Sequence, residues 1–200
     1  TEVTKSVASA NVIVSVEVLV APEEALEAPT TENLKKLTDD SLKAKFPVDL
    51  TEEYDANKIA DTINNIKEQL LNGSVEQTGA YDIWASYGID ENLTYYTISE
   101  SEVPTSLSEG DNYQYVITFV PKDVKVTNNY MDLQTVPYGS TIKLPVAGGD
   151  KVYDYVVTEA GASKYYNEGS TLKITDPVEI ERSEAAAKKV TTLLKLFAED

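Results

Sequence analysis

Two segments of this chain carry serine and lysine at the spacing that some serine acyltransferases use. Ser140 and Lys143, and again Ser170 and Lys173, spell S-x-x-K. The chemistry needs a helix, because the lysine must lie one helical turn from the nucleophile. Both segments are instead β-type in composition, so each serine and its lysine should lie on opposite faces of a strand. We therefore expect no catalysis from either motif and no enzyme activity.

Adjacent carboxylates could serve as glycosidase acids or as calcium ligands. They occur at Glu23-Glu24, Asp39-Asp40 and Glu52-Glu53, but none has the D-x-[DN]-x-[DN]-G spacing of a calcium loop. With 34 acidic residues among 200, such pairs arise by chance, and a solvated acidic surface is the simpler interpretation. A carboxylate hydrolase is a distant alternative, since its two acids can be far apart in sequence.

Three aromatic residues, Tyr81, Trp84 and Tyr87, could form a platform on which sugar rings stack. A spacing of three splits Tyr81 and Trp84 across a strand, and a lone tryptophan in a β protein more often fills the core. The two interpretations, a ligand-stacking surface and an ordinary core, both stay open, with the core favoured.

Composition excludes several classes of function. The chain has 17 basic and 34 acidic residues, a net charge of −17, and neither cysteine nor histidine. Such a charge repels nucleic acid, and without thiols and imidazoles most zinc, copper and haem sites cannot form. We predict no nucleic-acid partner, no cofactor and no metal centre. No apolar run reaches the roughly 18 residues of a membrane span, so we predict no membrane insertion.

The strongest strand pattern is an alternation from Ala8 to Val20. Its length admits two interpretations: a strand donated to the open sheet of another copy, which would build a filament, or the central strand of its own sheet. The apolar face of this candidate self-assembly strand consists of Val12, Val14, Val16, Val18 and Val20.

Three segments carry helical patterns, and the clearest has isoleucines at 59, 63 and 66, Asp55 as N-cap and Asn72-Gly73 as a stop. In the last, Ser183 would cap a helix with one apolar stripe. The predicted helices cover about residues 31–45, 55–72 and 184–198.

Short strands separated by glycine turns fill most of the rest, which is typical of a sandwich or barrel. We predict a mainly β, α+β fold with a helical insert and one or more immunoglobulin-like β-sandwich modules. The break at Pro121-Lys122-Asp123 predicts two domains: an α+β domain over 1–121 with a long first strand, and a β-sandwich-like domain over 122–200 closed by the C-terminal helix. The predicted strands cover residues 81–85, 93–99, 113–120, 124–127, 141–146, 151–158, 171–175 and 178–181.

A weak internal repeat relates residues 138–145 to 168–175, which share G-S-T-[I/L]-K. With its short tyrosine-rich strands and its acidic, cysteine-free composition, the chain resembles, mainly over 108–182, the immunoglobulin-like repeat modules of secreted Gram-positive bacterial surface proteins. This resemblance implies an extracellular scaffold or adhesion role without catalysis.

The function that we expect is that of a non-enzymatic structural or assembly protein, a surface scaffold or filament subunit whose partners are copies of itself. Two alternatives stay open: an adhesion module that binds carbohydrate, such as a surface glycan, or another ligand, and a virion structural protein. The expected location is extracellular or on the cell surface, with a virion as the alternative.

Overall fold

The computed structural model describes residues 8–72, 88–90 and 92–186, apart from the side chains of 38–42 and 70–72. The chain divides into two compact units: unit 1 comprises Thr1–Val20 and Lys36–Val120, and unit 2 comprises Ala21–Lys35 and Pro121–Asp200. The division after Val120 lies next to the predicted boundary. Ala21–Lys35, which we expected in the N-terminal domain, groups with unit 2 instead.

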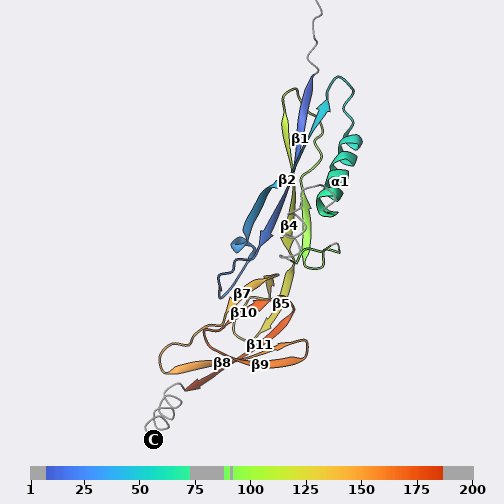
Figure 1. Cartoon of the computed structure of the whole chain (residues 1–200). Coiled ribbons are helices and arrows are strands. Elements are labelled where there is room, and N and C mark those ends of the chain that lie inside the picture. The colour runs from blue at the N-terminus through green and yellow to red at the C-terminus, as the bar shows by residue number, and fades with distance from the viewer. Residues whose placement is uncertain (1–7, 73–87, 91, 187–200) are drawn as a thin grey trace, which may run out of the picture. The chain divides into compact units, whose positions relative to one another are not determined.

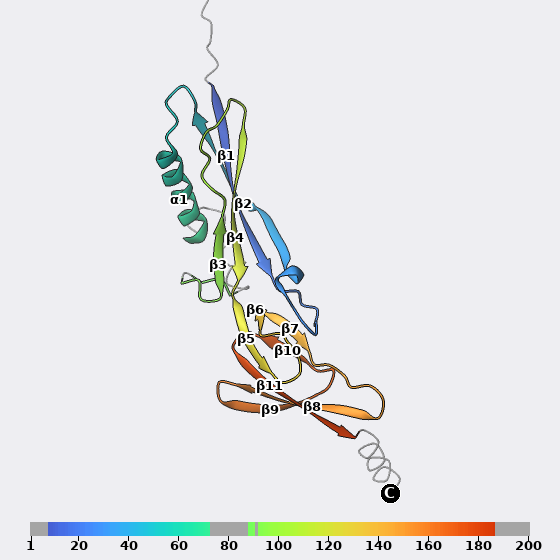
Figure 2. The same ribbon diagram turned by 180° about the vertical axis from the view of Figure 1, so that it is seen from behind.

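Unit 1 contains a four-stranded sheet in the order β2-β1-β4-β3. β1 and β4 are parallel, in register from Asn11 opposite Asn112 to Val18 opposite Phe119. β2 runs back along the other edge of β1, as Figures 1 and 2 show. The strands are β1 (Ser9–Val20), β2 (Lys35–Asp49), β3 (Tyr96–Glu100) and β4 (Asn112–Pro121).

The valine face of β1 is the core of this sheet. Val12 and Val14 are fully buried, Val16 and Val18 are 2% exposed, and Val20 at the strand end is half-buried. Register places Tyr115, Ile117 and Phe119 of β4 on the same buried face. In this structure β2 and β4 of the same chain occupy both edges of β1, as the intrachain interpretation of this strand expects. The donation of the valine face to another copy stays a prediction.

The helix predicted for 31–45 is absent. A single 3-10 turn, η1 (Thr31–Asn33), precedes β2, so the leucines at 34, 37 and 42 gave a misleading helical spacing. The second half of β2 alternates with a period of two, and its exposed Pro47 is tolerated because β2 is an edge strand. The inward positions are Ala44, Phe46 and Val48.

The helix predicted for 55–72 is confirmed as α1 (Ala56–Asn72). Asp55 caps it, since its Oδ1 accepts the N–H of Asn57 at 2.9 Å and that of Lys58 at 3.4 Å. Ile59 and Ile63 are the buried residues of its apolar stripe, at 6% and 1% exposure. The burial of these two side chains makes α1 part of the core of unit 1.

Unit 2 contains a five-stranded sheet, β6-β5-β11-β8-β9, and a two-stranded sheet, β10-β7. Side chains from both sheets share one core, in which Tyr155, Ile142 and Ile174 are fully buried. In the larger sheet β5 and β11 are parallel and the other described pairs are antiparallel. The strands are β5 (Asp123–Asn128), β6 (Thr135–Pro137), β7 (Ser140–Lys143), β8 (Lys151–Glu159), β9 (Ala162–Asn167), β10 (Thr171–Ile174) and β11 (Val178–Ala186).

The mainly β, α+β character is therefore confirmed, with eleven strands and one α-helix among the described residues. The immunoglobulin-like sandwich is not confirmed, because both larger sheets contain a parallel pair and sandwiches of that class are antiparallel.

The helix predicted for 184–198 is wrong at its start. β11 continues to Ala186, and Ser183, the predicted cap, lies opposite Asp154 of β8. Pairing with β8 overrides the helix-forming sequence at 184–186. The remainder of that predicted helix, from residue 187, lies outside the described residues.

The two repeat copies lie side by side. β7 carries the first copy and β10 the second, and they pair antiparallel with Ile142 opposite Leu172. The other edge of β7 is bonded by Ala21–Lys35, which we call the strap: Leu26 N–H donates to the Thr141 carbonyl at 3.0 Å, and Lys143 N–H donates to the Leu26 carbonyl at 2.9 Å. The chain thus leaves unit 1 after β1, is held in unit 2, and returns as β2.

Candidate functional site

The first S-x-x-K motif lies in strand β7, as expected. Ser140 is 1% exposed and its Oγ donates to the Pro137 carbonyl at 2.6 Å, whereas Lys143 is exposed. The buried serine and the exposed lysine point to opposite sides of the strand. In the second copy, Ser170 precedes β10 and Lys173 is exposed on it. Neither motif has the helical geometry that would make the lysine a base for the serine.

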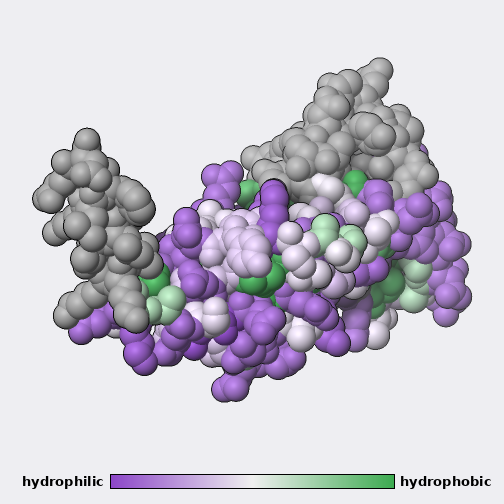
Figure 3. Space-filling model, turned by 90° about the horizontal axis from the view of Figure 1, so that it is seen from below, coloured by the Kyte–Doolittle hydropathy of each residue, from purple (hydrophilic) through white to green (hydrophobic). Residues whose placement is uncertain are grey.

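The candidate aromatic platform of Tyr81, Trp84 and Tyr87 lies outside the described residues. A different tyrosine meets the description of an exposed ring: Tyr165 on β9 is 86% exposed, far more than Val146 at 57%, the other exposed large hydrophobic residue in the described part of the chain. On the side of the molecule in Figure 3, hydrophobic residues form small separate spots in a hydrophilic surface. An aromatic ring this exposed has no packing role of its own.

The fold explains why Tyr165 points outward. Tyr155 and Val157 of β8 face the core, so Val156 between them faces out, and Tyr165 lies opposite Val156 in the β8–β9 register. Its neighbour Tyr166 lies opposite Tyr155 and packs against the core. The dipeptide Tyr165-Tyr166 in a strand was the signal in the sequence, since one ring of such a pair must face away from the core.

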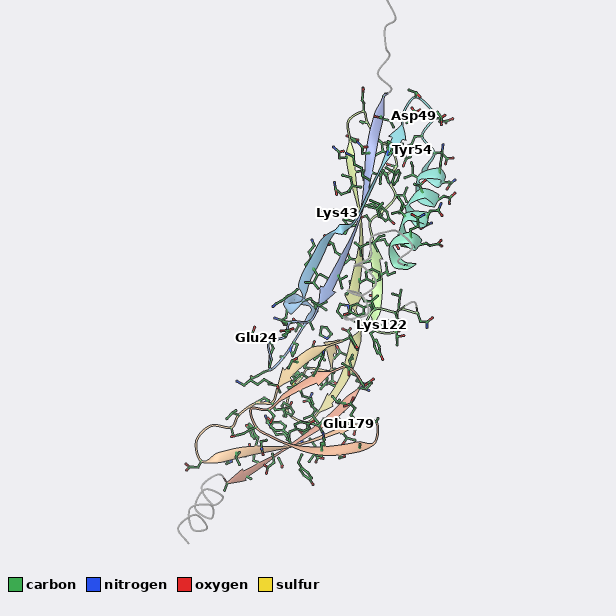
Figure 4. All side chains as sticks on the ribbon, viewed as in Figure 1. Glu24, Lys43, Asp49, Tyr54, Lys122 and Glu179 are labelled. Atoms are coloured by element: carbon green, nitrogen blue, oxygen red, sulfur yellow. The ribbon has the colours of Figure 1, made fainter. Side chains whose placement is uncertain are left out.

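Polar side chains surround Tyr165 on this outer face. Register places Asp154 opposite Asn167, and Thr158 opposite Ser163, whose hydroxyls are 2.8 Å apart. Beyond β8, Glu181 of β11 lies opposite Val156; Figure 4 labels Glu179 on the same strand. We call this surface the outer tyrosine face, comprising Asp154, Val156, Thr158, Ser163, Tyr165, Asn167, Glu179 and Glu181. It combines an aromatic ring with carboxylates, an amide and hydroxyls.

β9 is also the last strand of its sheet, so within the described residues its outer edge has no strand beside it. Such an edge is a template for pairing with another chain unless proline, charge or a covering segment blocks it. β9 has no proline and a single lysine, Lys164. β2, an edge strand of unit 1, differs: it carries Pro47, preceded by the exposed Lys43 and Lys45, as a protected edge does.

The inner side of β8 and β11 is held by the only arginine of the chain. The guanidinium of Arg182 lies 4.0 Å from the ring centre of Tyr153 and 4.7 Å from that of Tyr130. Both rings meet Tyr155 edge-on, and the Tyr155 hydroxyl donates to the Pro145 carbonyl at 2.7 Å. Burial raises the pKa of Tyr130 to about 12. This cluster fixes the sheet whose other face carries Tyr165.

In unit 1, a charged cluster joins the helix to the sheet. Lys67 of α1 pairs with Glu100 of β3 at 2.6 Å, and the Tyr115 hydroxyl donates to the other oxygen of Glu100 at 2.7 Å. Burial raises the pKa of Glu100, but the bonds from Lys67 and Tyr115 outweigh it and leave that pKa below its ordinary value. Burial raises the pKa of Tyr115 above its ordinary value, and the hydrogen bond to Glu100 raises it further.

Tyrosines also hold the segment that follows β3. The hydroxyl of Tyr54, in the turn before α1 (Figure 4), donates to the Pro104 carbonyl, and that of Tyr113 donates to the Glu102 carbonyl at 2.7 Å. With both hydroxyls bonded to backbone carbonyls, these contacts are structural ties between segments.

Among the residues that the structure describes, no three acidic side chains converge on a point where they could hold a metal ion. In the same part of the chain, no helix is both long and apolar enough to cross a membrane. No protein-family model, curated protein or solved structure matches this chain.

Proposed function

We propose that this protein is a non-enzymatic structural subunit that assembles with copies of itself into a surface scaffold or filament. The observation that carries the proposal is the β9 edge: a six-residue strand at the end of its sheet that has no proline and itself carries Tyr165, which is 86% exposed. Main-chain hydrogen bonds to a second copy would satisfy this edge, and the tyrosine ring would be buried in the contact. The extracellular or cell-surface location is part of the same proposal and is supported by the composition and the resemblance noted above.

The first test is the effect of Tyr165→Lys on self-association, measured by sedimentation velocity over a range of concentrations. A lysine on an edge strand opposes pairing, so the variant should be monomeric where the unmodified chain associates. Val146→Lys is the matched control, since Val146 is an exposed apolar residue outside β9. If both variants associate like the unmodified chain, pairing through β9 is wrong.

Salt provides a second measurement. A net charge of −17 makes the copies repel each other, and screening lowers that repulsion. We therefore expect association to increase between low salt and about 0.5 M salt, where the Debye length is a few ångströms. An unchanged mass distribution would show that charge repulsion does not control assembly.

A second candidate is glycan binding on the outer tyrosine face. The observation that favours it is that Tyr165 lies among Asp154, Asn167 and Ser163, which supply the hydrogen bonds that sugar hydroxyls need beside a stacking ring. Titration with a panel of surface oligosaccharides, followed by NMR, would test it. Binding that is lost in Tyr165→Ala, with the protein still folded, would favour this candidate. Binding that Tyr165→Ala leaves intact would place the glycan elsewhere.

A further inference from the structure

Among the described residues, the first and the last β-strand of each four-stranded or five-stranded sheet, taken in chain order, are parallel neighbours. β1 and β4 are so paired in unit 1, and β5 and β11 in unit 2. We propose that each unit is a mechanical clamp that resists tension applied along the chain. This inference rests on the proposed structural role, and it names the load that such a subunit carries.

The reason is geometric. A pull on the N-terminal side of β1 and on the C-terminal side of β4 acts along the strands in opposite directions. The interstrand hydrogen bonds of a parallel pair are evenly spaced, so they are loaded together and must break together. A hairpin pulled at its open end loses its bonds one after another. Because forced unfolding depends on the rate of crossing the unfolding barrier, the first arrangement ruptures at a higher force.

In unit 1 the parallel pair of β1 and β4 is long, and its inner face is shielded from water. Eight residues of β1 are in register with β4, and the ladder continues before them, since Asn11 N–H donates to the Asp111 carbonyl at 2.7 Å and Gly110 N–H to the Ser9 carbonyl at 2.9 Å. Within it, Val16 lies opposite Ile117, both at most 2% exposed. Water cannot readily replace a strained hydrogen bond beside such residues, so breaking it costs more than at the surface.

In unit 2 the parallel ladder is shorter, from Val178 opposite Val126 to Ile180 opposite Asn128. A side chain extends it. The amide of Asn129 donates to the Arg182 carbonyl at 3.0 Å and accepts the Arg182 N–H at 2.8 Å, as a backbone strand would do. The Arg182 side chain is in turn held against two tyrosine rings. Asn129 therefore adds two hydrogen bonds to the loaded pair.

The strap adds a second attachment in the path of the load. After Val20 the chain does not end in unit 1 but runs into the strap, whose Leu26 is bonded to β7 by two backbone hydrogen bonds. A pull on β1 that breaks its hydrogen bonds to β4 is next transmitted along the chain to the attachment of the strap.

The absence of cysteine in the chain makes the test direct, because tethers can be attached through introduced pairs. Asp123→Cys with Ala186→Cys pulls the full chain at the start of β5 and the end of β11, and it shears the parallel pair. Lys151→Cys with Ala186→Cys keeps one anchor and moves the other to the register partner of Ala186, so it unzips β8 from β11. Single-molecule force spectroscopy should give a severalfold higher rupture force for the first pair. Equal forces would overturn the clamp.

A second comparison isolates Asn129. Asn129→Ala should lower the rupture force with the shearing tether and leave it unchanged with the unzipping tether. Ser140→Ala also removes a side-chain to backbone hydrogen bond, but one outside the β5–β11 pair, and should not change the shearing force. If both substitutions lower it equally, the effect is one of general stability, and the role of Asn129 in the clamp is wrong.

The outcomes for assembly and for force are independent. A chain that associates through β9 but ruptures at equal force in both directions overturns the clamp alone. A chain that stays monomeric but resists shearing overturns the assembly proposal and leaves the clamp standing.

Discussion

Gly139 and Gly169 make the same hydrogen bond in the two copies of the internal repeat. Gly139 N–H donates to the Ile174 carbonyl and Gly169 N–H to the Leu144 carbonyl, each at 2.8 Å, with φ of +81° and +77°. With Ile142 opposite Leu172 between them, the copies are related by a local two-fold axis. The repeat is therefore structural, since each copy supplies the turn that closes the strand of the other.

This symmetry predicts that Gly139→Ala and Gly169→Ala destabilise unit 2 by similar amounts. An added Cβ has open space at Gly139 and an ordinary contact with Val146 at Gly169, so the cost comes from the positive φ and should be about 1–2 kcal/mol. Gly148→Ala is the control, because Gly148 has neither a positive φ nor a neighbour within 4 Å. Urea midpoints at unchanged m-value give the comparison. An equal loss in Gly148→Ala would contradict the explanation.

The central position of β1 predicts the result of removing it. Deleting residues 1–20 takes the middle strand from the sheet of unit 1 and uncovers buried Tyr115, Ile117 and Phe119. The truncated chain should lose the calorimetric transition of unit 1 and aggregate. A truncated chain that is soluble and keeps the far-ultraviolet helix signal of α1 would show that β1 is dispensable, as a donated strand would be.

The sequence patterns predicted correctly those elements whose buried residues recur at a regular spacing. β1 was predictable because its valines are buried at every second position, and α1 because a capped amphipathic helix repeats its isoleucines. β9 was not, because an exposed edge strand has no apolar face to produce an alternation. The first half of β2 is similarly polar, and β11 ends in residues that favour helices but are paired with β8. In each of these cases pairing with a neighbouring strand, rather than the local sequence pattern, decides the structure.

The cluster of Lys67, Glu100 and Tyr115 predicts a pH dependence. The pKa of Glu100 lies below its ordinary value of 4.5 in the folded state, so its stabilisation is present above that value and is lost as the pH falls through the lowered folded pKa. Glu100→Gln should therefore cost free energy of unfolding at pH 7 and little at pH 3. Glu52→Gln is the control, since Glu52 and Lys58 form a loose pair at 3.8 Å, both more than 70% exposed. A difference that does not change with pH would contradict this role of Glu100.

Tyr130 and Tyr155 should respond in opposite ways to loss of their hydroxyls. The Tyr130 hydroxyl is buried and, among the described residues, has no hydrogen-bond partner, whereas that of Tyr155 donates to the Pro145 carbonyl. Tyr130→Phe should therefore be neutral or stabilising, and Tyr155→Phe should cost about 1 kcal/mol. Each variant removes one tyrosine hydroxyl and nothing else, and thermal and urea unfolding would measure the change in its free energy of unfolding. A clear loss in Tyr130→Phe would mean that its hydroxyl is satisfied.

The candidate site was harder to predict than the fold. The exposure of Tyr165 depends on which of two adjacent tyrosines lies opposite Tyr155, and that is set by the register of the β8–β9 hairpin. The hairpin turns at Ala160-Gly161, both with positive φ, which fixes that register. The sequence alone shows a pair of tyrosines in a polar segment.

The strap and the parallel pairing of β1 have a consequence for biosynthesis. Asn11 must find Asn112, 101 positions further along the chain, and Leu26 must find Ile142, so neither unit can close while only its N-terminal part has left the ribosome. Contacts this remote in sequence make folding slow. Until β4 has been made, the valines of β1 are without the strand that lies beside them in the folded unit. A nascent chain of this kind needs either rapid completion or a chaperone that shields the segment of β1.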